Sequence, residues 1–461
     1  MPQLRRLIRK QGGHSRIVLG AVALCGILGG GGISHPLAEM ALQLALAALA
    51  VVWVWATPRR TFAQVPFSSW LIAGLVVLLP LAQLVPLPPA MWQSLPGRGP
   101  ELAALKLAGL EQSWRPLSLF PDLTIACALS MACAMLALLM TATLSRTART
   151  LALGVVALVA LASVVVGAGQ VAGGQAGGAG NVFRFYAPDF SFLLGFQNNR
   201  NSQADVLLIG MVCLAFVLRD MVLARVLPDR RRLVLGGVAV GSVVLALGVV
   251  LTGSRTGMGL LVPVLLAQAI LLVPWLKPDF GLRKIALMAA GGAVVTGLAA
   301  YALRDNAMIG RALGRFGTHG EFRPEIWTDT IFAIRTYLPW GTGMGTFLPV
   351  FMITERLEIV SDLVVNRAHN DFLELALEAG LPGLALAALI AGLLVRGVWR
   401  GMASAEARVR GQIFCATSAL LIIGAHSLLD YPLRSMSLAT IAAVCAAVLL
   451  DPRGVRPVDD D

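Results

Sequence analysis

His369 is the residue of this chain best suited to proton chemistry, because it stands in a polar cluster within an otherwise apolar sequence. It belongs to the stretch from Asn366 to Gly383, which reads N-R-A-H-N-D-F-L-E-L-A-L-E-A-G-L-P-G and lies where the longest polar segment meets a new apolar one. An imidazole can accept or donate a proton near neutral pH, as general acid–base catalysis requires. The stretch therefore predicts either a catalytic histidine or a histidine that orients a loop or grips a phosphate.

Acidic residues follow His369 at helical spacing. Asp371, Glu374 and Glu378 lie at i, i+3 and i+7, so a helix would place them on one face. Acidic side chains in a first turn also favour the helix dipole, and Asn370 suits the cap position before them. We therefore expect a capped and charged helix start. Capping explains Asn370 and Asp371, but it does not call for a histidine at position 369.

Isolated arginines form the second chemical feature. Arg200 stands in N-N-R-N, with Asn198 and Asn201 near it, directly before an apolar segment. Arg255 has a similar setting in T-G-S-R-T-G, between two apolar segments. A guanidinium offers a planar fork of donors that matches phosphate oxygens, so we expect both arginines to bind an anion such as a diphosphate at the membrane boundary. Snorkelling to lipid headgroups is the alternative.

Two further arginines are candidates for the same anion. Arg323 lies in F-R-P-E-I-W, where it would either contact the anion or pair with Glu325 or Asp329. Arg434 lies in A-H-S-L-L-D-Y-P-L-R-S, beyond the end of an apolar segment. We expect it to be a further anion ligand.

His426 and Asp430 lie in the same motif as Arg434. They are four residues apart, and on a helix this spacing makes a hydrogen-bonded pair easy to form. We expect the pair to shape the end of the helical bundle and to take no part in catalysis.

Composition places the chain among polytopic membrane proteins. Apolar residues make up 57%, charged residues 13%, and the mean hydropathy is +0.77, whereas about 25% of the residues in a soluble domain are charged. The six cysteines fall inside apolar segments without metal-binding spacing, so we expect neither disulfides nor a metal site. Since a span needs about 20 apolar residues, we predict an all-α fold with about twelve transmembrane helices, near 17–33, 38–56, 70–86, 121–143, 150–171, 204–218, 233–252, 257–276, 285–303, 372–395, 411–429 and 436–450.

Basic residues predict the orientation of this bundle. With the N-terminus in the cytoplasm, 23 of the 37 lysines and arginines fall in cytoplasmic segments, as the positive-inside rule requires. The net charge of +12 therefore indicates membrane orientation and lipid contact, and no nucleic-acid partner is expected. Both termini are predicted to be cytoplasmic and the active face periplasmic. The predicted domains are an N-terminal bundle (1–303) with a periplasmic segment (173–201), a large periplasmic loop between spans nine and ten (304–371), and C-terminal helices with a cytoplasmic tail (372–461).

Several motifs together resemble the O-antigen ligase and polymerase family of bacterial envelope enzymes. They are N-N-R-N, T-G-S-R-T-G, R-P-E-I-W, L-P-W-G-T-G-M-G-T-F and, most specifically, A-H-N-D-F-L-E-L-A-L-E-A-G-L-P-G. The resemblance is strongest from Asn198 to Gly383. It implies a membrane glycosyltransferase of the GT-C type in the bacterial inner membrane, acting on an undecaprenyl-diphosphate-linked sugar chain without a metal, a nucleotide sugar or another cofactor.

The resemblance also implies roles for individual residues. His369 would be the essential residue of the large loop, and Arg200 and Arg255 would bind the diphosphate. A histidine base would then accept the proton of the acceptor hydroxyl, while fixed cations stabilise the departing diphosphate. Supporting roles fall to the neighbouring polar residues Asn198, Asn201, Asn370, Asp371 and Glu374.

The same residues leave other functions open. A transporter or flippase of a lipid-linked glycan would also need arginines near a diphosphate, although neither repeated halves nor polar residues at mid-membrane depth are evident. A scaffold protein would not need the His369 cluster. Within the transferase class, the acceptor is lipid A core for a ligase, another lipid-linked repeat for a polymerase, or a serine or threonine for a protein O-oligosaccharyltransferase. The sequence does not predict the acceptor, the sugar or the oligomeric state.

Overall fold

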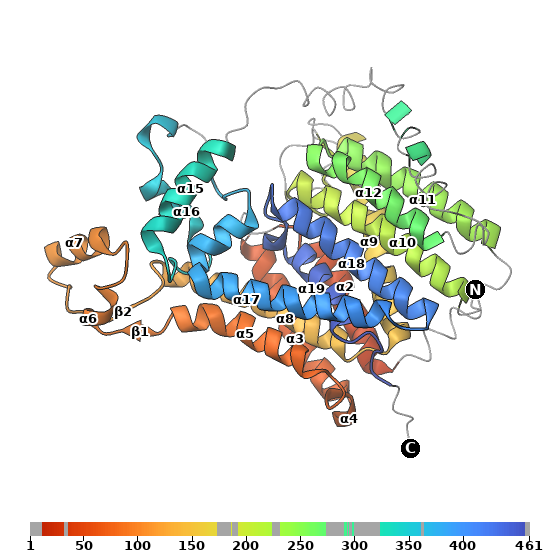
Figure 1. The fold of residues 1–461 in the computed structure, drawn as a ribbon, viewed down its shortest axis with the longest axis horizontal. Helices are drawn as coiled ribbons and strands as arrows, with labels where there is room; N and C mark the ends of the chain where they lie inside the picture. The colour runs from red at the N-terminus through yellow and green to blue at the C-terminus, as the bar shows by residue number, and fades with distance from the viewer. Residues whose placement is uncertain are drawn as a thin grey trace.

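The computed structural model describes residues 12–31, 36–172, 186, 192–223, 231–272, 290–292, 294, 297–298, 323–360 and 364–456. This part of the chain is almost entirely helical (Figure 1). The helices before residue 200 are α2 (Gly13–Leu28), α3 (Pro36–Ala56), α4 (Arg59–Phe62), α5 (Phe67–Gln83), α6 (Pro89–Trp92), α7 (Gly99–Leu107), α8 (Pro121–Ala142) and α9 (Arg146–Ala172). Those after it are α10 (Arg200–Leu223), α11 (Arg231–Leu251), α12 (Arg255–Leu272), α15 (Arg323–Tyr337), α16 (Phe347–Thr354), η4 (Leu357–Ile359), α17 (Asp371–Met402), α18 (Ala407–Ser427), η5 (Pro432–Arg434) and α19 (Met436–Leu450). Two short strands, β1 (Pro86–Leu87) and β2 (Arg115–Pro116), pair antiparallel.

The predicted membrane architecture is confirmed. Within the described residues, 8 helices are long and apolar enough to cross a membrane, namely α3, α8, α9, α10, α11, α12, α17 and α18. Three shorter apolar helices, α2, α5 and α19, coincide with further predicted spans. The predicted span 285–303 lies mostly outside the described residues, as do the glycine-rich segment at 173–180 and part of the predicted large loop.

Helix α10 forms the centre of the bundle. It packs against α9, α11, α12 and α18 (Figure 1), and nearly every residue from Ser202 to Asp220 is buried. A mainly apolar helix of this kind has no polar face to turn outward, so it is buried on all sides by its neighbours. Small residues permit the close approach, because a Cβ added to Gly210 would overlap the side chain of Ala160.

The bundle has two chemically different ends. At one end, the connections after α2 and before α10 and α19 are joined by backbone hydrogen bonds, including Asn198 N–H to Gly30 O (2.9 Å) and Ser437 N–H to Gly29 O (3.0 Å). We call this the site end, because it carries His369. The opposite end, called the basic end, is held by arginine ion pairs such as Arg146 with Glu406.

Helices α15 and α16 lie beyond the site end, beside the α6 and α7 segment (Figure 1). Their apolar side chains form a separate small core, which includes Ile326, Tyr337, Phe347 and Phe351 together with Leu377 of α17. The predicted large loop is therefore folded where the structure describes it, and its core rests on the first turns of α17.

Helix α17 is broken at Gly380, whose φ of 57° and ψ of −149° are not helical. Pro382 has no N–H, so the carbonyl of Glu378 has no helical donor. The segment after α15 supplies the missing partners. The Gly343 N–H donates to Glu378 O (2.9 Å), and the Leu381 N–H donates to Pro339 O (2.9 Å). These bonds fix the N-terminal part of α17, and with it the residues that precede the helix.

Candidate functional site

The cap predicted before α17 is present. Asn370 accepts hydrogen bonds from the N–H groups of Phe372 (3.0 Å) and Leu373 (3.1 Å) through its side-chain oxygen, and its amide nitrogen donates to Leu428 O (3.1 Å). The cap thus also ties the start of α17 to the end of α18. The capping and functional interpretations of this stretch are compatible, because His369 immediately precedes the cap.

His369 is held in an uncommon conformation against Asp430. Its φ is 51°, in the left-handed region that non-glycine residues rarely adopt. The Nδ1 atom lies 3.1 Å from Oδ1 of Asp430, and the ring centroid lies 5.1 Å from that of Tyr431. The side chain is 29% exposed, whereas that of Asp430 is 2% exposed. Since Nδ1 is bound, Nε2 is the nitrogen available to meet a substrate.

Asp430 is fixed by three hydrogen-bonding groups. Besides His369, it accepts through Oδ2 from the amides of Asn199 (3.2 Å) and Asn201 (2.6 Å). Burial opposes ionisation, but these bonds prevail and hold the pKa of Asp430 below its usual value. Burial raises the pKa of the adjacent Tyr431 to about 12, so this phenol stays neutral. The aspartate is therefore ionised at neutral pH and accepts a hydrogen bond from His369.

The predicted pair of His426 with Asp430 is wrong. His426 Nδ1 instead lies 2.7 Å from Oδ1 of Asp205, and both of these side chains are buried. Helix α18 ends at Ser427, so Asp430 lies beyond the helix and the four-residue spacing no longer brings the two side chains together. Asp430 is thereby free to face His369, a contact that the sequence analysis missed.

Three of the predicted anion-binding arginines begin helices. Arg200 starts α10, Arg255 starts α12 and Arg323 starts α15. Arg200 directly adjoins Asn199 and Asn201, which bind Asp430, and its guanidinium lies 5.1 Å from the centroid of the Phe192 ring.

Arg255 and Arg323 also belong to the site end. Helix α12, which Arg255 starts, packs against α10, and a Cβ added to Gly257 in its first turn would overlap the side chain of Ala204 near the start of α10. The charge of Arg323 acts on the buried His426. Of the two carboxylates considered as its partner, Asp329 is bound by Arg356 (2.7 Å).

Arg434 lies in an internal ion-pair network. Its Nη2 atom is 3.1 Å from Glu374 and 2.7 Å from Glu378, and both carboxylates are fully buried. Glu374 also binds Arg367 (2.6 Å). Two carboxylates thus already neutralise Arg434, and its predicted contact with a substrate anion stays a prediction.

Glu374 and Asp371 connect α17 to the neighbouring backbone. The second oxygen of Glu374 accepts from the N–H of Ala368 (3.2 Å), the residue before His369. Asp371 accepts from the hydroxyl of Ser427 (2.8 Å) at the end of α18. Both carboxylates therefore fix the chain on either side of the histidine, and their predicted supporting role in the reaction stays a prediction.

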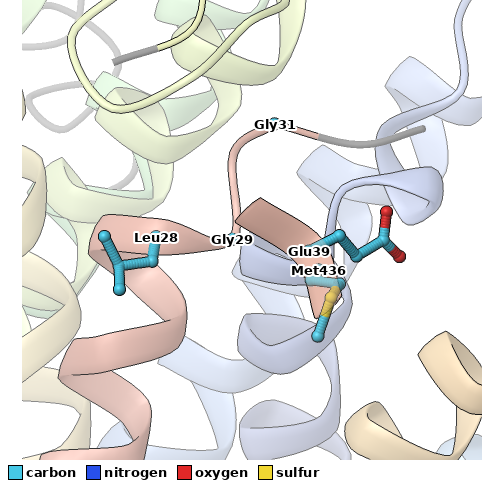
Figure 2. Close-up of a pocket in the computed structure, with 5 residues that line it drawn as sticks. All are labelled: Leu28, Gly29, Gly31, Glu39 and Met436. Carbon is cyan, nitrogen blue, oxygen red and sulfur yellow. The ribbon is translucent and has the colours of Figure 1, made fainter. Parts of the chain in front are cut away.

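The described residues contain no cluster of three or more His, Cys, Asp or Glu side chains that could hold a metal ion. All six cysteines are free and lie in helices, buried or half-buried. A shallow hollow at the site end is lined by Leu28, Gly29, Gly31, Glu39 and Met436 (Figure 2). None of these five residues belongs to the cluster around His369.

Comparison with known proteins adds one match. A family model described as O-antigen ligase matches residues 240–388, about a third of the chain. The matched segment includes Arg255, Arg323 and His369, and it ends shortly after the break in α17. Arg200 and Asp430 lie outside it. A comparison with curated proteins found no match.

Proposed function

The chain carries an O-antigen ligase domain and crosses a membrane several times, and from this premise we propose that it transfers a polyprenyl-diphosphate-linked glycan to an acceptor hydroxyl. The observation that carries the proposal is the contact of the half-exposed His369 with the buried Asp430, 61 residues further along the chain. A histidine oriented by a buried carboxylate is an arrangement suited to general-base catalysis.

In the proposed reaction, Nε2 of His369 accepts the proton of the acceptor hydroxyl. The hydroxyl oxygen forms a bond to the anomeric carbon of the sugar, while the bond from that carbon to the lipid diphosphate breaks. The electron pair leaves with the diphosphate. Asp430 stabilises the imidazolium that forms, and general-base assistance of this kind is worth about 10²–10⁴ in rate.

Arg200, Arg255 and Arg323 are proposed to bind the diphosphate. Negative charge grows on the leaving group during transfer, and positioned cations lower the free energy of such a transition state. Each of these arginines also stands at a helix start, where the backbone N–H groups and the helix dipole favour anions. These groups together could stabilise the leaving group without a metal ion.

The site end is proposed to face the periplasm of a bacterial inner membrane. The positive-inside rule supports this orientation, because the basic end holds Arg146, Arg149, Arg408 and Arg410 near the connections between spans. The polyprenyl chain of the donor would then lie in the outer leaflet, with its diphosphate beside the helix starts.

The test is transfer by purified protein in lipid nanodiscs, with a polyprenyl-diphosphate glycan as donor and EDTA present. Lipid A core and a second lipid-linked repeat are offered as separate acceptors. We expect product from the wild type and at least a 10²-fold loss in His369→Ala. His14→Ala is the matched control, because His14 lies in the first turn of α2, at the other end of that helix from Gly29.

Each outcome has a defined meaning. Product on lipid A core identifies a ligase, and a ladder of longer lipid-linked chains identifies a polymerase. If the protein binds donor, glycosylates neither acceptor, and behaves identically after His369→Ala, the transferase proposal fails. Movement of the donor across the bilayer would then indicate a transporter.

A further inference from the structure

Arg219 is a buried cation at the basic end, far from the proposed transfer site along α10. Its side chain is 6% exposed, and its Nε and Nη1 atoms are buried without a hydrogen-bond partner in the described structure. A buried guanidinium without a paired anion is strongly unfavourable. Charged side chains within membrane spans are rare and usually have a partner.

The carboxylates of the basic end are bound to other arginines. Both oxygens of Asp220 are taken by Arg408, at 2.7 Å each. The remaining pairs are Glu406 with Arg146 and Asp451 with Arg149. Asp220 still attracts the neighbouring Arg219 electrostatically, but it forms no hydrogen bond with that guanidinium. Among the described residues, this end therefore provides no carboxylate to pair with Arg219.

A second positive charge lies close to the first. Arg410 of α18 repels Arg219 electrostatically, and its Nη1 atom is anchored to the carbonyls of Ser404 (2.6 Å) and Ala405 (2.9 Å). Gly411 allows Arg219 to lie against α18, because a Cβ added there would overlap Nη1 of Arg219. Two guanidinium groups thus lie within electrostatic reach of each other where α10 contacts α18.

We propose that Arg219 and Arg410 bind the phosphate of an anionic lipid headgroup. Guanidinium groups match phosphate oxygens in geometry and charge, and basic sites between transmembrane helices bind such lipids. Arg219 lies one turn before the end of α10 at Leu223, and Arg410 lies in the first turn of α18. Both therefore sit at the level where a span leaves the hydrocarbon, and Leu223 is itself exposed. This site is independent of the proposed transfer reaction.

The test uses delipidated full-length protein in neutral detergent. Bound lipid is counted by native mass spectrometry, and thermal unfolding is followed with phosphatidylglycerol, phosphatidylcholine or inorganic phosphate added. We expect phosphatidylglycerol to bind and raise the Tm, with little effect from the other two additions. Arg219→Gln should weaken phosphatidylglycerol binding by about tenfold or more, as expected for loss of a charge-assisted hydrogen bond. Arg410→Gln should weaken it as well.

Arg60→Gln is the control, since it removes an equal charge from an exposed residue of α4. Without lipid, Arg219→Gln should be at least as stable as the wild type, because it removes an unpaired buried charge. A marked loss of lipid-free stability would instead mean that Arg219 has a structural role, and the proposal would be wrong. Unchanged lipid binding in both variants would also overturn it, and equal stabilisation by inorganic phosphate would refute the lipid assignment.

Discussion

Asp430→Asn is the substitution that most directly tests how the site is assembled. The aspartate accepts from His369 on one oxygen and from Asn199 and Asn201 on the other. An asparagine has one oxygen and one amino group, so it cannot accept on both sides. If the asparagine oxygen faces His369, its amino group lies against the amides of Asn199 and Asn201, which are also donors. If the asparagine side chain is flipped, its amino group donates to Nδ1 of His369. The imidazole proton is then on Nε2, which can no longer accept a proton from a hydroxyl.

The expected magnitude follows from the lost interaction. A hydrogen bond to a charged group contributes about 1.5–3 kcal/mol, and each 1.36 kcal/mol is about tenfold in rate. Asp430→Asn should therefore lower kcat by roughly 10- to 150-fold. The KM for the donor should change little, because the proposed diphosphate ligands, Arg200, Arg255 and Arg323, are not substituted. Combining the change with His369→Ala should add little further loss, since the two residues act as a unit.

The assay is steady-state transfer with purified protein, and Asp122→Asn in the exposed first turn of α8 is the matched control. Asp430→Glu should recover part of kcat, because it restores the charge. The reasoning is refuted if Asp430→Asn transfers as fast as the wild type while His369→Ala is inactive. A change confined to the KM of the donor would likewise show that Asp430 acts on substrate binding and not on the base.

The lowered pKa of Asp430 also predicts a pH dependence of stability. Its folded pKa lies below its unfolded value of about 3.9, so its contribution is complete above that value and is lost as the pH falls through the folded pKa. The difference in Tm between the wild type and Asp430→Asn should therefore narrow as the pH falls below about 4. A difference that instead widens as the pH falls below about 4 would contradict the lowered pKa of Asp430.

Two further substitutions test the support of the site by thermal unfolding. Gly380→Ala should destabilise the protein by about 3 kcal/mol or more, because the added Cβ overlaps the carbonyl of Pro339 at a backbone conformation restricted to glycine; Gly392→Ala, in open space on the same helix, should be neutral or stabilising. Arg434→Gln should cost about 3–5 kcal/mol, because it leaves Glu378 buried without its ion-pair partner. If Arg434→Gln is instead as stable as the wild type and fails only to bind donor, Arg434 is a diphosphate ligand, as the sequence motif predicts.

The membrane helices could be predicted because each is encoded within its own segment. A run of about 20 apolar residues identifies a span without reference to the rest of the chain, and eleven of the predicted segments coincide with described helices. The cap at Asn370 is equally local, since its acceptor and donors lie within three residues. The break at Gly380 is not, because it depends on hydrogen-bond donors and an acceptor supplied by residues 339–343.

Helices α15 and α16 were not predicted within the large loop, because neither is long and apolar enough to register as a span. Their core is completed by Leu377, which belongs to a membrane helix. A segment whose core is completed by a distant helix has too few apolar residues of its own to be recognised from its sequence. This explains why the sequence identified the loop and its motifs but not its folded form.

The contacts of the site, like the fold of the loop, depend on residues far apart in the sequence. His369 could be singled out from its neighbours, whereas its partner required knowledge of where α18 ends. In the sequence, His426 and Asp430 have the four-residue spacing of a side-chain pair on one helix. In the fold, the chain leaves the helix between them, and His426 turns to Asp205 of α10 while Asp430 turns to His369. No spacing rule encodes that division, because both partners come from other parts of the chain.

The separate contacts of His426 and Asp430 link the proposed site to the packing of α10. One face of its first turns binds the end of α18 twice, through Asn201 to Asp430 and through Asp205 to His426. The same helix begins with Arg200, a proposed diphosphate ligand. A shift of α10 along α18 would therefore move the anion site and misalign the carboxylate that orients His369 together. The proposed base and the proposed leaving-group site therefore share one structural support, the first turns of α10.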